Sequence, residues 1–132
     1  MHAIKVPVSP GELLDKITIL RIKSLRMSDP QKLHNVRVEL DLLQDTWSNS
    51  AWGGVDIDAE VAELMKVNER LWVIEDDIRD KERAQAFDAG FIRLARAVYV
   101  ENDERAAIKR RINLKLGSNI VEEKSYKPYK SG

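Results

Sequence analysis

The chain has 132 residues, of which 43% are hydrophobic and 33% charged, and its 22 basic residues balance 22 acidic ones, so the formal net charge is zero. This size and composition predict one folded domain with a buried core and exclude a disordered chain. The lack of cysteine excludes a disulfide framework, a thiolate zinc site and a cysteine nucleophile, and the neutral balance argues against a dedicated nucleic-acid-binding protein.

No apolar run approaches the length of about 18 residues that would indicate a membrane-spanning helix. The first seven residues also lack the basic segment and the long apolar segment of a secretory signal. We therefore expect a cytoplasmic protein that does not interact with membranes.

The first two helices are predicted to form a short hairpin over residues 9–47. Ser9 is a good N-cap, the proline after it suits the first helical position, and Glu12 completes a capping box. An Asp-Pro pair at residues 29–30 repeats the same device and ends the first helix. Because this connection is short, the two helices are expected to be antiparallel.

A second, longer hairpin is predicted over residues 56–117. Its first helix is expected to run to about Phe87, Asp88 is a plausible N-cap for its second helix, and Gly117 suits the left-handed residue that closes it. Each helix would span roughly 40 Å at about 1.5 Å per residue. These helices are longer than those of the first hairpin, so part of the long hairpin is expected to extend beyond it. We expect this overhang to contact a partner chain or the folded-back tail.

These elements predict an all-α fold. Two antiparallel helical hairpins are expected to form a four-helix up-down bundle, followed by an irregular C-terminal tail at residues 118–132 that folds back on the long hairpin. Residues 1–8 would form an N-terminal arm, and residues 1–132 a single domain.

Polar residues interrupt the apolar seams of the third and fourth helices at matching levels. In a hairpin that turns near residue 88, Glu75 is expected to lie opposite Asn102, with Arg105 one turn further on. The candidate site comprises these polar seam residues and one aromatic residue on a flanking face: Asn68, Glu75, Tyr99, Asn102, Arg105 and Lys109.

This polar layer has two interpretations, because charged side chains in a helical seam are costly unless they are paired. The first is a sealed, hydrogen-bonded network that fixes one register of the helices. The second is a pocket in which Arg105 and Lys109 bind a small anionic ligand, such as a sugar nucleotide or a phosphate. In that pocket Glu75 and Asn102 would position the two cations, and Tyr99 would stack on the ligand.

Other function classes have weaker support. Residues 56–88 are acidic and residues 105–130 basic, but an antiparallel hairpin lays the acids beside the bases, so we do not expect nucleic-acid binding. Pairs of acids three residues apart resemble in outline those of the Mg²⁺-dependent all-α nucleotide pyrophosphohydrolases, but such pairs are common on solvated helices. No catalytic triad, glycine-rich phosphate loop or zinc signature is present, so we predict no catalytic residue, metal ligand or cofactor.

Four segments also carry a resemblance to a known family: residues 6–20, 71–79, 99–113 and 116–126. Over nearly its whole length the chain resembles a family of small bacterial proteins catalogued as a domain of unknown function. The resemblance implies no activity, but it implies an accessory role linked to cell-surface polysaccharide synthesis. It singles out four residues of the polar layer and five others: Glu12, Asp15, Lys16, Lys124 and Tyr126.

The sequence therefore favours a non-enzymatic accessory or protein-interaction module, with a second copy of the chain or another protein as its partner. Two observations carry this hypothesis: the lack of a catalytic constellation and the overhang of the long hairpin. A binding site for a small anionic ligand is the alternative.

Overall fold

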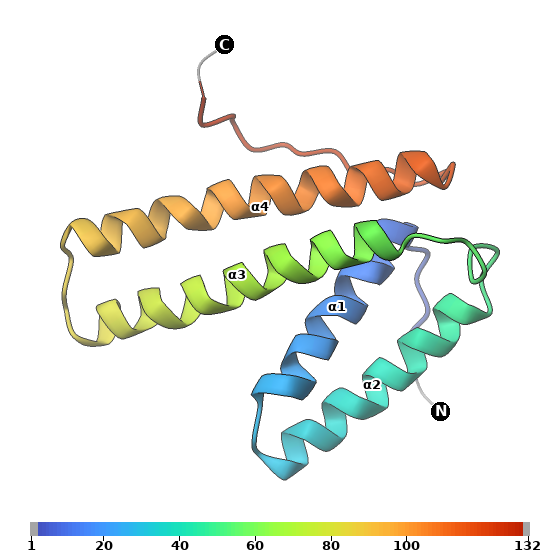
Figure 1. The fold of residues 1–132 in the computed structure, drawn as a ribbon, viewed down its shortest axis with the longest axis horizontal. Coiled ribbons are helices and arrows are strands. Elements are labelled where there is room, and N and C mark those ends of the chain that lie inside the picture. The colour runs from blue at the N-terminus through green and yellow to red at the C-terminus, as the bar shows by residue number, and fades with distance from the viewer. Residues whose placement is uncertain (1–2, 131–132) are drawn as a thin grey trace.

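The computed structural model describes residues 3–130, so the two outermost residues of the predicted arm and of the predicted tail lie outside it. It contains four helices, namely α1 (Pro10–Arg26), α2 (Pro30–Ser48), α3 (Asp58–Arg83) and α4 (Ala89–Lys115), and no strand within the described residues. Figure 1 shows the short α1–α2 hairpin against one end of the long α3–α4 hairpin. The all-α class and the arrangement of two antiparallel hairpins are confirmed.

The helix ends follow the predicted local chemistry. Ser9 Oγ accepts the amide hydrogen of Glu12 at 3.2 Å, and the carboxylate of Asp88 accepts that of Phe91 at 2.9 Å. Gly117 has a φ of +64° just after α4, as the left-handed closing residue does. These short-range signals were read correctly.

Two local predictions were wrong. α3 ends at Arg83 rather than near Phe87, because Gln85 adopts a φ of +55° that a helix cannot contain. The capping box is only half formed: the Glu12 side chain turns away from the amide group of Ser9 and binds Lys109 on α4 at 2.6 Å.

The bundle packs unevenly around α1. Among the described helices, the backbone of α1 runs beside α2, α3 and α4, whereas that of α2 runs beside α1 alone. The core lies where α1 meets the long hairpin, and Trp47 of α2 reaches its edge. Its buried apolar residues are Leu14, Ile57, Leu64, Val67, Ile108 and Ile112.

The far half of the long hairpin has no such core. None of the described residues from 69 to 107 is fully buried, although α3 and α4 continue side by side through this stretch. We call residues 69–107 the distal hairpin, and the rest of the helical fold the base. The overhang predicted from helix length is therefore present.

The tail folds back along α4, as Figure 1 shows. Glu123 pairs with Arg110 at 2.7 Å, and the rings of Tyr99 and Tyr129 lie 5.3 Å apart between centroids. No helix within residues 3–130 is both long enough and apolar enough to cross a membrane.

Candidate functional site

The candidate site centres on Asp15, a carboxylate of α1 that is 0% exposed. Asp15 Oδ1 accepts hydrogen bonds from Asn68 Nδ2 on α3 and from Arg105 Nε on α4, both at 2.9 Å. A second guanidinium nitrogen of Arg105 binds Asp15 Oδ2, so the pair is bidentate. Three helices thus converge on one buried acid.

The remaining polar atoms around Asp15 are satisfied as well. Asn68 Nδ2 also donates to Thr18 Oγ1 at 3.0 Å, and the Thr18 hydroxyl donates to the backbone carbonyl of Asp15 at 2.7 Å. Within the part of the chain that the structure describes, no buried side-chain nitrogen or oxygen lacks a hydrogen-bond partner. A buried ion pair is tolerated when its other lone pairs and protons are bonded in this way.

Lys109 extends the network by one turn of α4. Its Nζ lies 2.6 Å from Glu12 Oε2 and 4.0 Å from Asp15 Oδ2, while Lys16 Nζ lies 3.8 Å from the other oxygen of Glu12. Arginine and lysine on α4 therefore each face an acid on α1. These two acids are one of the pairs three residues apart in the sequence, and each of them binds a cation of α4.

The start of α1 is held against α4 by a second set of hydrogen bonds. The amide hydrogen of Gly11 is donated to Asn113 Oδ1 at 2.7 Å. From the tail, the Glu122 carboxylate accepts from Ser9 Oγ at 2.6 Å and from Asn113 Nδ2 at 3.2 Å. A β-carbon on residue 11 would lie 2.6 Å from the backbone oxygen of Lys109, so this close approach requires glycine.

The ion pair with Asp15 stabilises the charged form of Arg105. The hydrogen bonds that Arg105 donates to Asp15 raise the pKa of its guanidinium above the ordinary value, although partial burial opposes this. The positive charge of Arg105 is therefore matched inside the fold by the carboxylate of Asp15.

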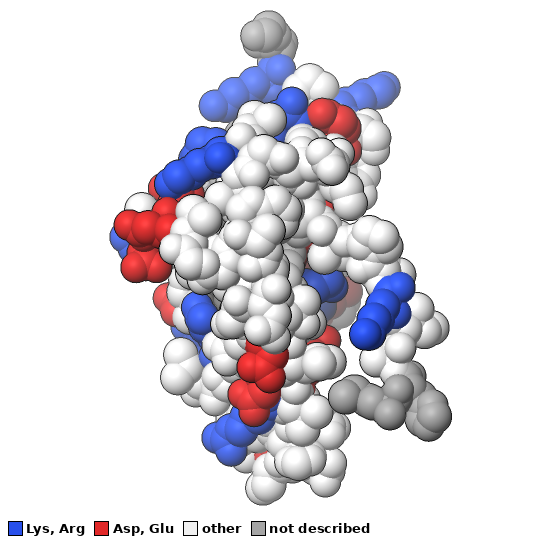
Figure 2. Space-filling model, turned by 90° about the vertical axis from the view of Figure 1, so that its right-hand side faces the viewer, with Lys and Arg blue, Asp and Glu red and all other residues white. Residues whose placement is uncertain are grey.

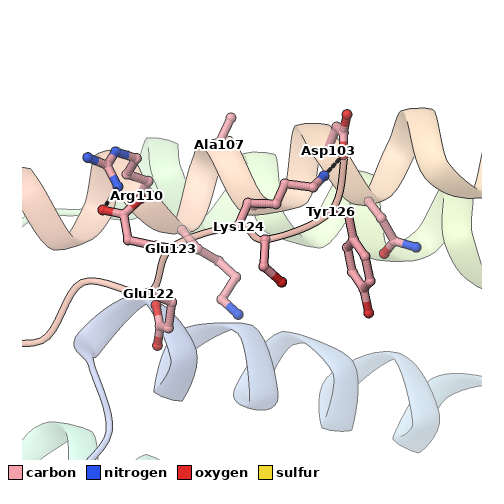
Figure 3. Close-up of a pocket in the computed structure, with 11 residues that line it drawn as sticks. Asp103, Ala107, Arg110, Glu122, Glu123, Lys124 and Tyr126 are labelled. Atoms are coloured by element: carbon pink, nitrogen blue, oxygen red, sulfur yellow. Dashed lines mark hydrogen bonds and ion pairs between the residues drawn. The ribbon is translucent and has the colours of Figure 1, made fainter. Parts of the chain in front are cut away.

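A hollow of about 770 Å³ lies between α4 and the tail, beside this network. Figure 3 shows Lys124 reaching Asp103, Arg110 reaching Glu123, and Glu122 pointing toward the start of α1. Its other lining residues include Asn102, Lys109 and Tyr126. Each cation of the hollow is already bound to a carboxylate, so the hollow has no excess of positive charge.

A second hollow, of about 420 Å³, lies where α1 leaves the long hairpin. Asn68, Glu75, Asn102 and Arg105 line it together with apolar residues of α1 and α3. The two hollows share Asn102, so the network opens toward solvent at both edges of α4.

Five of the six predicted residues bind these acids or line the two hollows. Asn68 and Arg105 bind the same acid, Lys109 binds the neighbouring acid of α1, and Asn102 lines both hollows. Tyr99 lies further along α4 against Tyr129 of the tail.

The predicted pairing of Glu75 with Arg105 is corrected. Glu75 lines the second hollow, but its ion-pair partner is Arg79 on its own helix, at 3.4 Å. The prediction considered α3 and α4 alone. In the structure, Asp15 of α1 lies beside Arg105, and its two carboxylate oxygens bind two nitrogens of the Arg105 guanidinium.

The pattern of polar residues within the long hairpin did not predict six residues of the site. They lie in or just before α1, near the end of α4 and in the tail: Ser9, Gly11, Asp15, Thr18, Asn113 and Glu122. One signal was available. Asp15 and Thr18 lie within a run that is otherwise rich in leucine and isoleucine, which suggests a helix buried on several sides.

Comparison with curated proteins and with solved structures finds no match to this chain. A family model described as a family of unknown function, DUF6165, matches residues 4–131. This agrees with the resemblance drawn from the ordered motifs of the sequence. The chain belongs to the DUF6165 family of unknown function.

Proposed function

We propose that this protein is a non-catalytic interaction module, in which the base is a rigid mount and the distal hairpin binds a protein partner through its helix surfaces. The observation that carries this proposal is the absence of any fully buried residue among the described residues 69–107. The accessory role that the resemblance implies, next to cell-surface polysaccharide synthesis, is the setting in which we propose that the module acts.

Helices in stable domains bury an apolar stripe against a further layer. In the base, α1 supplies that layer, but nothing among the described residues supplies it for most of the distal hairpin. Large apolar side chains remain exposed there, including Ile92 at 56% and Phe87 at 55%. Contiguous exposed apolar surface commonly marks an interaction site.

The charge distribution favours a protein partner over a nucleic acid. In Figure 2, which views the end of the molecule away from the distal tip, uncharged side chains fill the centre and acids and bases both lie around the rim. Across the long hairpin, acids of α3 are matched by bases of α4: Glu60 binds Lys115 at 2.6 Å, and Glu63 binds Arg111. Such pairs cancel the field that would attract phosphates.

Photo-crosslinking from defined positions tests the proposal. A photoreactive residue at Ile92 or Val100 of the distal hairpin should give a discrete cross-linked product in cells. The matched control is Val38, which is equally exposed but lies on α2 of the base. No product from the distal positions, or the same product from Val38, would refute the assignment of the surface.

A small anionic ligand in the hollow under the tail is the second candidate. Lys109, Arg110 and Lys124 line this hollow together with the ring of Tyr126, and its volume suits a small molecule. An anion would have to displace a carboxylate from at least one of these cations. A thermal-shift screen of inorganic phosphate and sugar nucleotides, with and without Mg²⁺, tests it: ligand at 100 times its Kd should add about 2.7 kcal/mol of stability.

A further inference from the structure

We propose that the partner of the distal hairpin is a second copy of the same chain, docked so that α3 of each copy lies along α4 of the other and both tips point the same way. This inference rests on the proposed function and names the partner of that surface. It follows from a match between two rows of exposed side chains.

The first row runs along α3 at helical spacings of three, four and three residues, so that its members share one helix face. The second row runs along α4 at spacings of three, four and four. All eight side chains are exposed: Arg70, Val73, Asp77 and Asp80 on α3, and Arg93, Arg96, Val100 and Glu104 on α4. We call them the outer rows.

The two rows belong to the same side of the hairpin. Arg70, Val100 and Glu104 line one shallow hollow of about 360 Å³, which spans the two helices and is bordered by Tyr129 of the tail. Arg70 and Val73 line a neighbouring hollow of about 500 Å³ between α3 and Arg26 at the end of α1. This side is therefore continuous across the hairpin and is hollowed near its middle.

The ion pairs between α3 and α4 show which residues lie opposite each other along the hairpin, and we call such residues level. Arg70 binds Glu101 at 2.9 Å and Glu60 binds Lys115 at 2.6 Å, so residues at one level have numbers that sum to between about 171 and 175. On this scale Val73 is level with Val100, with a sum of 173. The two valines are 42% and 41% exposed.

At equal levels the outer rows are complementary in charge. Asp77 is level with Arg96 and Asp80 with Arg93, each with a sum of 173, and Arg70 is level with Glu104, with a sum of 174. Acid therefore matches base at three levels, and valine matches valine at the fourth.

Four of the six charged groups are free for such a contact, whereas Arg70 and Asp80 are already paired within the copy. Within residues 3–130, none of Asp77, Arg93, Arg96 and Glu104 forms an ion pair or a side-chain hydrogen bond. The rows are side by side in one copy, so their side chains point outward together. A twofold axis along the hairpin would place the α3 row of one copy directly over the α4 row of the other, at equal level.

This arrangement is a closed, isologous interface that makes a four-helix bundle from two hairpins. It would cover the valines and set each acid against a base. The opposite arrangement, with the tips pointing apart, places α3 over α3 and α4 over α4. That arrangement would bring acids against acids near Asp77, and bases against bases near Arg96, so like charges disfavour it.

Cysteine crosslinking tests the register, because the chain has no cysteine of its own. The variants Val73→Cys and Val100→Cys are prepared separately. Mixed and mildly oxidised, they should give an interchain disulfide, because Cα atoms within about 7 Å can be bridged. Each variant alone should give none, since neither valine meets its own copy. A mixture of Val73→Cys with Val38→Cys on α2 is the control and should also give none.

Charge reversal tests the complementarity. Asp77→Arg or Arg96→Asp alone should raise the Kd of the dimer at least tenfold, and the double variant should recover most of the loss. The matched control is Asp41→Arg on exposed α2, which should leave the dimer unchanged. Sedimentation equilibrium measures the Kd, and light scattering the mass.

The outcomes separate this inference from the proposed function. If the wild-type protein is a monomer and its distal hairpin cross-links to a different protein, the proposal of a second copy is refuted. The proposed interaction module is then unaffected. If Asp77→Arg leaves the dimer intact, the proposed register is refuted. The register is also refuted if Val73→Cys alone forms an interchain disulfide. No association of any kind from the distal hairpin overturns both.

Discussion

The base and the distal hairpin share α3 and α4, yet they are held together by different forces. In the base, α1 lies across the hairpin and buries a core together with the carboxylate of Asp15. In the distal hairpin, the ion pairs that link α3 to α4 are partly exposed, as between Arg70 and Glu101 and between Lys81 and Asp88. Pairs of that kind contribute little to stability, because water and salt screen them.

The difference indicates which part of the molecule is made for stability and which for binding. The buried polar side chains of the base are all hydrogen-bonded within the described part of the fold, so they specify one packing of three helices. On the outer rows, Asp77, Arg93, Arg96 and Glu104 have no partner within the described residues, whereas Arg70 binds Glu101 and Asp80 binds Arg83. Mutations should therefore act on stability in the base and at Arg105, which binds Asp15, and on association at the outer rows of the distal hairpin.

The largest effect should come from Asp15→Ala. Removal of this acid leaves the half-buried Arg105 guanidinium and the buried amide of Asn68 without their shared acceptor. Breaking such a pair from one side costs about 3–5 kcal/mol. Urea denaturation should show this loss, whereas Asp77→Ala on the distal hairpin should stay within about 0.5 kcal/mol of wild type. A loss below about 1 kcal/mol for Asp15→Ala would end the distinction between the two regions.

Gly11→Ala should follow in size, because it separates α1 from α4 without removing any hydrogen-bonding group. The new β-carbon would lie 2.6 Å from the backbone oxygen of Lys109 and 2.9 Å from Asn113 Oδ1, and the backbone oxygen cannot move aside as a flexible side chain would. Overpacking of this kind costs about 1–3 kcal/mol.

Gly54→Ala is the matched control, since a β-carbon there meets no atom within 4 Å. Its thermal midpoint should equal that of wild type or exceed it slightly. If the two glycine variants melt together, the close approach of α1 to α4 is not essential to the base.

Much of the fold could be predicted from the sequence, because its signals act over three or four residues. Ser9, Asp88 and Gly117 mark helix ends by chemistry that is complete within one turn. The end of α3 was missed because Gln85 takes a left-handed conformation without being glycine.

The candidate site was predicted only in part, because its partners depend on where α1 crosses the long hairpin. Spacing along α4 correctly singled out Arg105 and Lys109 as charges in the seam. Spacing along α3 then predicted Glu75 as the acid nearest to Arg105. In the structure, Arg105 instead binds Asp15 of α1, which crosses the hairpin there, and Glu75 binds Arg79. Seam periodicity within one hairpin carries no information about a third helix.

Glu122→Ala should have a smaller effect, since it releases the tail from the base. The Glu122 carboxylate accepts from Ser9 Oγ and Asn113 Nδ2, so its loss leaves two donors near the start of α1 with one partner fewer. A loss of about 1–2 kcal/mol is expected. Glu123→Ala, which removes only an exposed pair with Arg110, should cost less than about 1 kcal/mol. Equal losses would mean that the tail does not stabilise the base through Glu122.

The smallest expected effect lies in the turn of the distal hairpin and depends on pH. The hydrogen bond from the Phe91 amide group, followed by that from Lys81, lowers the pKa of the Asp88 carboxyl below its ordinary value of 3.8. A lowered folded-state pKa adds stability that is complete above the unfolded value and is lost as pH falls through the folded value. Wild type should therefore lose this contribution below about pH 3.8, while Asp88→Asn, which caps without titrating, should not. Urea midpoints at pH 7 and pH 3 measure the difference between the two proteins. If both lose the same amount, the cap charge contributes nothing to the distal hairpin, and its stability depends on the surfaces that a partner would cover.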